Sequence, residues 1–377
     1  MDQPTLTIIH VDTAHDWRGG QAQVEALVRG LARRGHRLTV VTPRGSRLAE
    51  RLADVPVEMA YDAPRGEWDW RAGRRLRQLA ESRRPDLLHA HSALAHAVAW
   101  HAHSGGNVAP IVVSRRVDFP VAANWLSRRK YLHPACYYLA ISTAVRDVLI
   151  RGGVPSDRVF LVPSGVDPAK FTYQTDRSAT RRSLGIGDNE FLVCTIGALT
   201  DHKDHATLIR AAALALAQAP ELRFIVLGEG ELRPRLEAQI AQEDLGERFQ
   251  LLGFRSDVEA CLTASDLFVL SSHMEGLCTS LLDAMLLARP IVATRAGGVG
   301  DVIGDGETGL LVEIRQSEAL AGAIVRMARD RDLRVRLAAA GARRVREQFS
   351  IERTIQLTEA AYREILTRGE NTPQKEK

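Results

Sequence analysis

The sequence is poor in cysteine and has no long uninterrupted apolar run. Its 377 residues include four widely separated cysteines and no C-x-x-C pair. Neither a cysteine zinc site nor a disulfide framework is therefore expected, and a cytoplasmic location fits best. No apolar run approaches the roughly 18 residues of a membrane-spanning helix. The first residues also lack the basic and apolar regions of a secretory signal.

Other absences narrow the class of function. There is no G-x-x-x-x-G-K-[ST] loop, which leaves an NTPase unsupported, and no G-x-S-x-G turn of a serine hydrolase. Aromatic residues make up 5% of the chain and the formal net charge is +4. This mild basicity comes without a nucleic-acid reader motif, so no nucleic acid is expected as a partner. Anionic lipid or a phosphate-bearing substrate is compatible with the charge.

Short apolar runs alternate with helical patterns along the chain. The first run ends at Val11, a glycine pair follows, and a helix is expected from about Gln21 to Arg34. Continuous apolar strands between helices indicate parallel sheets covered on both faces. Strands are predicted at 6–11, 37–42, 86–90, 111–114, 138–142, 159–162, 191–196, 223–227, 249–252, 267–270, 290–294 and 310–313.

A stretch rich in proline, glycine and polar residues interrupts this alternation at 163–176 and is typical of a linker. The fold class is therefore α/β, with two doubly wound, Rossmann-like units. Ligands are expected beyond the carboxyl ends of the strands, in a cleft where two such units face each other. The predicted divisions are an N-terminal domain at 1–165, a second domain at 166–350 and a C-terminal helix at 351–377.

The most informative segment is 271–285, with the sequence SSHMEGLCTSLLDAM. A strand ends at Ser271, and a helix is expected to begin near Thr279, which is a plausible N-cap. A helix N-terminus after a glycine-containing turn offers N–H groups and a positive dipole to a phosphate. Glu275 lies in the loop beside that terminus, where its carboxylate can accept hydrogen bonds from sugar hydroxyls. Asp283 lies about one turn inside the helix, within reach of a ribose.

This segment resembles the E-x7-E signature of glycosyltransferase family 4, commonly written E-G-x-P-x-x-L-L-E-A-M. Cys278 stands in place of the usual proline and Asp283 in place of the second glutamate. The resemblance implies a GT-B fold and transfer of a sugar from a nucleoside diphosphate sugar, with retention and without a metal or other cofactor. It implies that Glu275 holds the donor sugar and Asp283 the ribose.

Other segments resemble the same family, so the likeness covers nearly the whole chain. The segments 297–302 and 305–312 are similar to G-G-x-P-E-V and D-G-x-T-G-L-L-V. Phe349-Ser350 with Tyr362 and Arg363 resembles a closing helix that crosses back to the first domain. The loop around Phe254 resembles the segment that receives the base.

The loop 197–203 is similar to the family's G-R-L-x-x-x-K loop, which binds the diphosphate. Lys203 supplies a compact cation for phosphate oxygens. Ala198 occupies the place of the family arginine, so a second cation is expected from elsewhere. Arg18, beside the Gly19-Gly20 turn, is a candidate for that cation. Gly20 is expected to let backbone N–H groups approach the substrates, because glycine has no side chain in the way.

Polar residues also follow two later strands of the first domain. His89 and His91 share one face of their strand. Their spacing would also fit a metal pair, but no third ligand is evident, so no metal site is predicted. They are interpreted as hydrogen-bonded strand-end residues, and His91 also as an acceptor contact. Arg116 follows the next strand, where family members often carry a histidine, and is suited to an acceptor phosphate or carboxylate. Asp330-Arg331-Asp332, despite its D-x-D pattern, is interpreted as a helix boundary.

The predicted site follows from these assignments. The catalytic candidates are Glu275, Lys203 and His91. The acceptor candidates are Arg18, Gly19, His91 and Arg116. The donor candidates are Gly20, Lys203, Phe254, Glu275, Leu277, Cys278, Thr279, Ser280 and Asp283.

The function that these residues predict is glycosyl transfer to an acceptor hydroxyl. No placed nucleophile opposes the leaving group, so front-face attack assisted by the departing phosphate is preferred to a covalent intermediate. The family suggests bacterial envelope polysaccharide or lipopolysaccharide synthesis. The alternatives are another GT-B enzyme, such as an epimerase, and a degenerate sugar-nucleotide-binding scaffold.

A surface of the first domain is predicted to touch an anionic membrane or a lipid-linked acceptor. The segment 125–132 places aromatic residues beside Arg128, Arg129 and Lys130, and further arginines follow one another in 71–84. Cations near an anionic surface contribute about 1 kcal/mol each before salt screening. The alternative is two solvated helix faces. The enzyme is therefore expected in the cytoplasm, or peripherally on the inner face of the cytoplasmic membrane.

Overall fold

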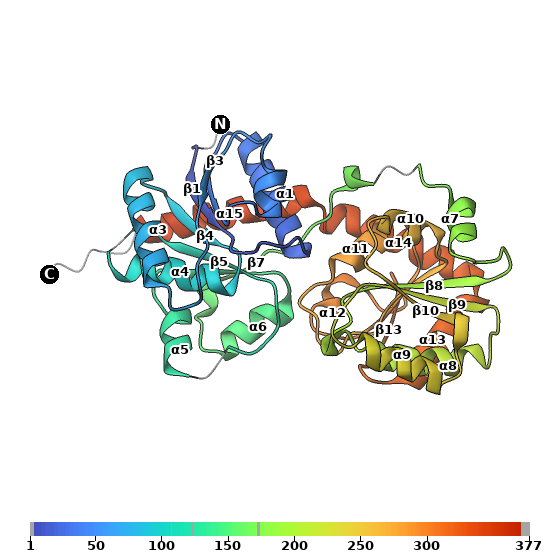
Figure 1. Ribbon diagram of the computed structural model, residues 1–377. Helices are drawn as coiled ribbons and strands as arrows, with labels where there is room; N and C mark the ends of the chain where they lie inside the picture. Colours follow the sequence, from blue (N-terminus) through green and yellow to red (C-terminus); the bar gives the residue numbers. More distant parts are fainter. Residues whose placement is uncertain (1–3, 107, 122–123, 172–173, 371–377) are drawn as a thin grey trace. The chain divides into compact units, whose positions relative to one another are not determined.

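The computed structural model describes residues 4–106, 108–121, 124–171 and 174–370 (Figure 1). The chain forms two compact units. Unit 1 comprises residues 1–165 and 351–377, and unit 2 comprises residues 166–350. These divisions fall at the residues chosen from the sequence, and the 351–377 segment belongs to unit 1.

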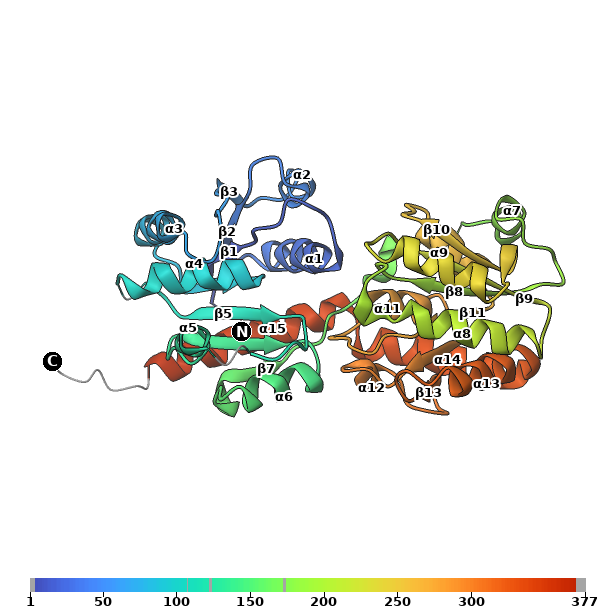
Figure 2. The same cartoon turned by 60° about the horizontal axis from the view of Figure 1, so that its bottom comes forward.

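Within the described residues, unit 1 is built on a seven-stranded parallel sheet with the order β3-β2-β1-β4-β5-β6-β7. Helices cover both of its faces (Figure 2). The strands are β1 (Thr7–Val11), β2 (Arg37–Thr42), β3 (Glu58–Tyr61), β4 (Leu87–Ala90), β5 (Ile111–Arg115), β6 (Cys136–Ala140) and β7 (Val159–Leu161). The helices are α1 (Gly19–Arg33), α2 (Arg47–Arg51), α3 (Trp70–Arg83), α4 (Ala93–Ser104), α5 (Trp125–Tyr131), α6 (Thr143–Arg151), the 3-10 turn η1 (Ser156–Arg158) and α15 (Ile351–Glu370).

Within the described residues, unit 2 repeats the plan with a six-stranded parallel sheet in the order β10-β9-β8-β11-β12-β13. Its strands are β8 (Phe191–Ile196), β9 (Leu222–Leu227), β10 (Phe249–Gly253), β11 (Leu267–Leu270), β12 (Ile291–Thr294) and β13 (Leu310–Val312). Its helices are α7 (Arg177–Ser183), α8 (His205–Leu216), α9 (Arg233–Gln242), α10 (Val258–Ala264), α11 (Thr279–Leu286), α12 (Val299–Val302), α13 (Ser317–Arg329) and α14 (Arg331–Gln348), with 3-10 turns η2 (Pro168–Lys170), η3 (Asp201–Lys203) and η4 (Gly246–Arg248).

The strands form because their apolar residues are buried from both sides. β4 and β11 are buried along their whole length, as expected for central parallel strands. The α/β fold class and the strand positions predicted from the sequence are confirmed. The sequence analysis missed the edge strand β3, whose residues are exposed or half-buried, because an edge strand carries a weaker apolar signal.

The C-terminal helix α15 completes the core of unit 1. Ile355, Tyr362 and Ile365 are fully buried against residues of β1, β2 and α1. Gly30 of α1 allows this approach, because a Cβ added there would lie 2.2 Å from Ile355 Cδ1. Arg34, after α1, forms an ion pair with Glu359 of α15. A segment distant in sequence is therefore integral to unit 1.

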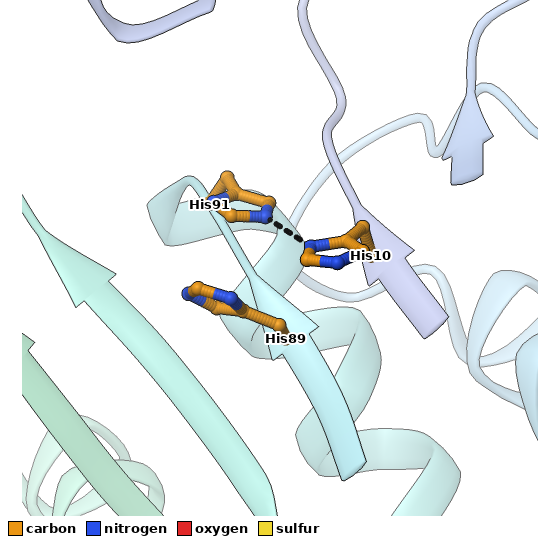
Figure 3. Close-up of side chains that lie close together, drawn as sticks. All are labelled: His10, His89 and His91. Atoms are coloured by element: carbon orange, nitrogen blue, oxygen red, sulfur yellow. Dashed lines mark hydrogen bonds between the residues drawn. The ribbon is translucent and has the colours of Figure 1, made fainter. Parts of the chain in front are cut away.

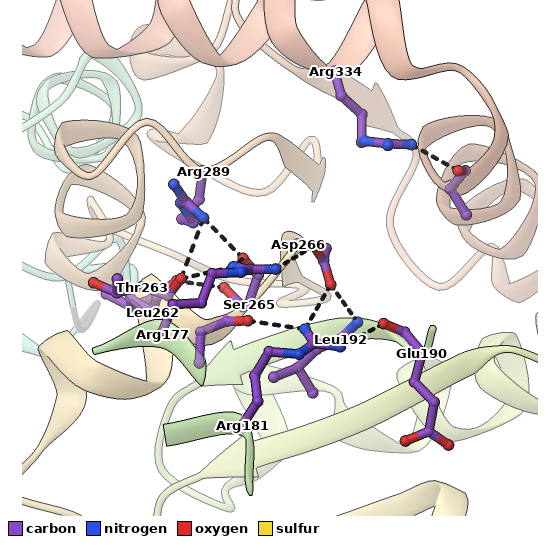
Figure 4. Close-up of polar contacts among 12 residues, drawn as sticks. Arg177, Arg181, Glu190, Leu192, Leu262, Thr263, Ser265, Asp266, Arg289 and Arg334 are labelled. Carbon is purple, nitrogen blue, oxygen red and sulfur yellow. Dashed lines mark hydrogen bonds and ion pairs between the residues drawn. The ribbon is translucent and has the colours of Figure 1, made fainter. Parts of the chain in front are cut away.

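A polar network holds α7 onto the sheet of unit 2 (Figure 4). The carboxylate of Asp266 pairs with Arg177 at 2.6 Å and with the buried Arg181 at 3.0 Å, and it accepts from the Leu192 N–H. Arg181 also donates to the Gly187 and Glu190 carbonyls. The buried guanidinium is therefore fully compensated, as a buried charge must be.

Two local features complete the fold. Asp330 caps α14, accepting from the Leu333 N–H at 2.9 Å, which confirms the helix-boundary interpretation of the D-x-D pattern. None of the described helices combines the length and the apolar character required to cross a bilayer.

Candidate active site

An ion pair joins two of the predicted donor residues of unit 2, Lys203 and Glu275. Lys203 ends η3, after β8, and Glu275 lies in the loop between β11 and α11. Lys203 Nζ is 2.6 Å from Glu275 Oε2, and both side chains are largely buried. Burial lowers the pKa of Lys203, but Cys278 and the Glu275 carboxylate outweigh this effect, so the pKa is raised above its usual value. The Lys203 ammonium and the Glu275 carboxylate therefore fix each other's position, and with it the positions of their two loops.

The backbone brings the neighbouring motifs to the same point. The Gly298 N–H donates to the Glu275 carbonyl at 2.8 Å, and the Ser272 hydroxyl donates to its carboxylate at 3.2 Å. Gly197 lies directly over Lys203, since a Cβ there would be 3.3 Å from Lys203 Cδ. Segments that the sequence separates by up to about a hundred residues therefore form one constellation.

The start of α11 differs in detail from the prediction. Thr279 is the first helical residue, and Cys278 is the N-cap, without a side-chain capping bond. The prediction of Thr279 as N-cap is wrong, because the helix starts one residue earlier than expected. Leu277 and Cys278 are buried. Ser280 donates to the Ile196 carbonyl at 3.2 Å, which ties the helix to the end of β8.

Asp283 is already paired in this structure. Its carboxylate forms an ion pair with Lys170 of η2. Burial raises the pKa of Asp283, and Lys170 offsets part of that rise. A ribose at this carboxylate would share it with, or displace, the Lys170 ammonium. Phe254, after β10, is 82% exposed and is available to a ligand.

The predicted residues of unit 1 lie at the carboxyl ends of β1, β4 and β5. Gly19 and Gly20 form the first turn of α1, and Arg18 is its N-cap, exposed and without a side-chain capping bond. Arg116 is half-buried, and its Nη1 donates to the His91 carbonyl at 3.1 Å. A Cβ on Gly20 would lie 4.0 Å from Arg116 Cδ. The glycine turn, His91 and Arg116 are thus neighbours.

His91 is one of three buried imidazoles that cluster in unit 1 (Figure 3). His10 of β1 joins His89 and His91, with ligating atoms within 4.8 Å of one another. The expectation that no third ligand accompanies the histidine pair is therefore wrong. The third ring comes from a neighbouring strand, 79 residues before His89, which no local spacing could indicate.

The histidine cluster is held by hydrogen bonds. His10 Nδ1 and His91 Nε2 are 2.9 Å apart. His89 bonds Tyr362 of α15 through Nδ1 at 2.5 Å and Ser114 through Nε2 at 2.9 Å. Burial lowers the pKa of His10 to about 3 and those of His89 and His91 well below the usual range. An ion bound by all three rings would require His89 to release Tyr362 or Ser114.

Asp12, after β1, is a site residue that the sequence analysis missed. It is 1% exposed, and burial raises the pKa of its carboxyl, an effect that Gln21 and Arg116 partly oppose. Gln21 Nε2 is 3.3 Å from its Oδ1. Its position directly after a buried strand was the available signal, because polar residues at strand carboxyl ends border ligand sites in such folds.

Comparison with known proteins decides the family. The model of "Glycosyltransferase Family 4" matches residues 17–170, and that of "Glycosyl transferases group 1" matches residues 176–344. The chain belongs to the family 4 glycosyltransferases. The two models meet near the division between the units, so each unit carries one half of the family signature.

The enzyme is similar to named glycosyltransferases over lengths that range from about half of the chain to nearly all of it. It is 27% identical to alpha-D-kanosaminyltransferase of Streptomyces kanamyceticus, over 91% of this chain and 98% of that one. It is 28% identical to UDP-Gal:alpha-D-GlcNAc-diphosphoundecaprenol alpha-1,3-galactosyltransferase of Escherichia coli, over 47% of each chain. Its fold matches the Anabaena HepE structure with UDP and glucose at a TM-score of 0.82, with 22% identity, 95% of this chain and 100% of that chain covered. The GT-B fold and the nucleotide-sugar glycosyltransferase class are thereby confirmed.

Proposed function

We propose that the enzyme moves a glycosyl unit from a nucleoside diphosphate sugar to a hydroxyl of a saccharide or lipid-linked acceptor, with retention, in cell-envelope polysaccharide or lipopolysaccharide synthesis. The observation that carries the donor assignment is the Lys203–Glu275 pair. On donor binding, the Lys203 ammonium turns to the diphosphate and the Glu275 carboxylate accepts hydrogen bonds from sugar hydroxyls. Both groups are preorganised in a largely buried place, where charge stabilisation is strong.

The reaction itself needs little beyond this placement. As the glycosidic bond breaks, negative charge grows on the leaving diphosphate, and Lys203 stabilises it. The departing phosphate oxygen accepts the proton of the attacking hydroxyl on the same face, which gives retention. The neutral imidazole of His91 can exchange a hydrogen bond with an acceptor hydroxyl without placing charge there, and His10 holds that ring by a hydrogen bond at 2.9 Å. No metal is required in this scheme.

The test begins with binding. A panel of nucleotide sugars is screened for thermal stabilisation of the full chain, because a ligand at 100 times its Kd adds about 2.7 kcal/mol. The stabilising donor is then incubated with candidate acceptors, and release of nucleoside diphosphate and the product anomer are measured by NMR. Binding without release in any acceptor mixture would favour the binding-scaffold alternative. Activity lost in EDTA and restored by Mg²⁺ would contradict metal independence.

We also propose that unit 1 contacts an anionic membrane that carries the acceptor. Trp68, Trp70 and Trp125 are 54%, 58% and 66% exposed. Residues 67 and 68 and helix α5 line one cavity of about 300 Å³, so the two segments share a surface. Exposed tryptophans beside cations are typical of proteins that lie in the membrane interface. The E. coli relative is named for an undecaprenol-linked acceptor, which supports this class.

The structure corrects the number of exposed cations predicted for that surface. Lys130 is buried and paired with Glu67 at 2.9 Å, so it does not offer a third cation. Arg128 and Arg129 are exposed, and Arg129 lies over the Trp125 ring at 5.4 Å. Co-sedimentation with phosphatidylglycerol vesicles should fall strongly in Arg128→Glu with Arg129→Glu and persist in the double lysine variant. Equal sedimentation of both variants would contradict the proposal.

A further inference from the structure

The cavity of about 300 Å³ between residues 67–68 and α5 lies outside the candidate active site. Its wall comes from the loop before α3, from α4 and from α5 with its N-cap. The lining residues are Glu67, Trp68, Ala97, Trp100, His101, Asn124, Leu126, Ser127 and Lys130. None of them is a predicted donor or acceptor residue. The volume is at the lower end of the range for ligand pockets, which suits one small ring better than a nucleotide.

Two buried side chains of the wall each have a ring nitrogen without a partner. Trp100 and His101 are only 7% and 3% exposed. Trp100 Nε1 and His101 Nδ1 form no hydrogen bond with any residue that the structure describes. Buried polar groups in native proteins are nearly always hydrogen-bonded. Two unpaired nitrogens in the wall of one cavity therefore indicate that the cavity takes a polar occupant.

The hydrogen bond on the other side of the His101 ring determines which nitrogen carries the proton. His101 Nε2 lies 2.8 Å from the Glu67 carbonyl oxygen. A carbonyl oxygen only accepts, so Nε2 carries the hydrogen. Burial lowers the pKa of His101, so the ring is neutral at neutral pH and Nδ1 is an unprotonated acceptor. Trp100 Nε1–H only donates, and the wall therefore carries one unpaired donor and one unpaired acceptor.

Aromatic packing and an ion pair hold this wall in place. The rings of Trp70 and Trp100 pack on His101, with centroid distances of 4.0 and 4.9 Å. Lys130 Nζ pairs with the Glu67 carboxylate at 2.9 Å, which fixes the Glu67 side chain to α5. The cavity-lining Trp68 is 54% exposed, so its ring is open to a ligand. The cavity thus combines an accessible aromatic face with polar groups that are already in position.

We propose that this cavity binds one pyranose ring of a saccharide. A hydroxyl group both donates and accepts, so sugar hydroxyls can accept from Trp100 Nε1 and donate to His101 Nδ1. The apolar face of the sugar ring packs on Trp68. A hydrocarbon chain would leave both nitrogens unpaired, which is costly. A phosphate would meet Lys130 already paired with Glu67. The inference goes beyond the proposed function, because this site binds a sugar without transferring it.

The indole signals of the tryptophans test the proposal on the full chain. The chain has five tryptophans, so protein labelled with ¹⁵N at tryptophan alone gives one resolved group of indole N–H signals, and Trp100→Phe assigns that of Trp100. Methyl glycosides of glucose, galactose, mannose and N-acetylglucosamine are titrated singly. Glycerol is the control for a polyol without a ring, and geraniol for an apolar chain. We expect at least one glycoside, and neither control, to shift the Trp100 signal to saturation.

Two variants separate the cavity from the surface around it. Trp68→Ala should weaken binding of that glycoside about fivefold, because an aromatic contact is lost. Trp125→Ala is the matched control, since Trp125 is an exposed tryptophan of α5 that does not line the cavity; its affinity should stay within about twofold of wild type. Unfolding curves show that both variants are folded. Equal affinity in wild type and Trp68→Ala overturns the proposal, as does a Trp100 signal that no glycoside shifts or that geraniol alone shifts.

Discussion

Two cations lie at the carboxyl ends of the two parallel sheets, and they differ in what neutralises them. Lys203 in unit 2 has Glu275 at 2.6 Å. Arg116 in unit 1 donates to a carbonyl and has no ion pair within the described residues. An anionic ligand that binds Lys203 must displace the Glu275 carboxylate from it. An anionic ligand that binds Arg116 displaces no carboxylate and supplies the negative charge that the fold does not pair with this guanidinium. The two units therefore differ in what an anion must displace in order to bind.

The largest expected effect is on turnover in the paired site. Lys203→Ala and Glu275→Ala should each lower kcat by about 10² to 10³, as when one preorganised stabilising group is removed. The reason is that Ala198 leaves Lys203 as the cation of its loop. The measurement is nucleoside diphosphate release with the cognate donor. If either variant, purified and folded, turns over at the wild-type rate, that residue does not act on the donor as proposed.

The next effect is on the stability of unit 2. Lys203→Met leaves the largely buried Glu275 carboxylate without its cation, which should cost about 3 kcal/mol. The double variant Lys203→Met with Glu275→Gln should recover part of this loss. Peptide-resolved hydrogen exchange separates unit 2 from unit 1. Equal protection of unit 2 in wild type and Lys203→Met would show that the pair is only weakly stabilising.

Acid should act on unit 1 through its histidine cluster. The folded-state pKa values of His10, His89 and His91 are lowered, so the unfolded chain binds protons first as the pH falls below about 6.5. Stability should be fully present above that pH and should decline below it, by up to about 1.4 kcal/mol per pH unit for each histidine. All five tryptophans lie before residue 126, so their fluorescence in urea reports unit 1. In His10→Asn the decline should be shallower; an unchanged slope would remove His10 from this account.

The smallest expected effect distinguishes the two arginines of unit 1. Arg18 is exposed at the N-cap of α1 and has no side-chain capping bond. Arg18→Ala should therefore change kcat/KM by about threefold or less, below 1 kcal/mol, while Arg116→Gln lowers it by at least tenfold. Steady-state kinetics on both variants provide the comparison. A larger loss in Arg18→Ala would make Arg18 the second cation that the loop lacks.

The sequence predicted what local patterns encode. Apolar runs located the central strands, and the 271–285 motif located Glu275 beside a helix start, because both depend on neighbours in sequence. The sequence analysis could not locate His10 beside His89 and His91, since that contact depends on β1 pairing with β4. The same holds for Lys170 on Asp283 and Glu67 on Lys130, which join residues 113 and 63 positions apart. Ion pairs between residues distant in sequence form only in the folded chain. They determine which of the predicted cations are already paired with a carboxylate and which are not.

The most direct test of the contrast is the stability of unit 1 in Arg116→Gln without added anion, followed by tryptophan fluorescence in urea. If Arg116 is an uncompensated charge, its removal takes away a desolvation cost and leaves no carboxylate unpaired. The account predicts an unfolding free energy within about 1 kcal/mol of wild type, or higher, since only one hydrogen bond to a carbonyl is lost. A loss of about 3 kcal/mol or more, as for breaking a buried ion pair, would show that Arg116 already has its partner within the chain and would contradict the account.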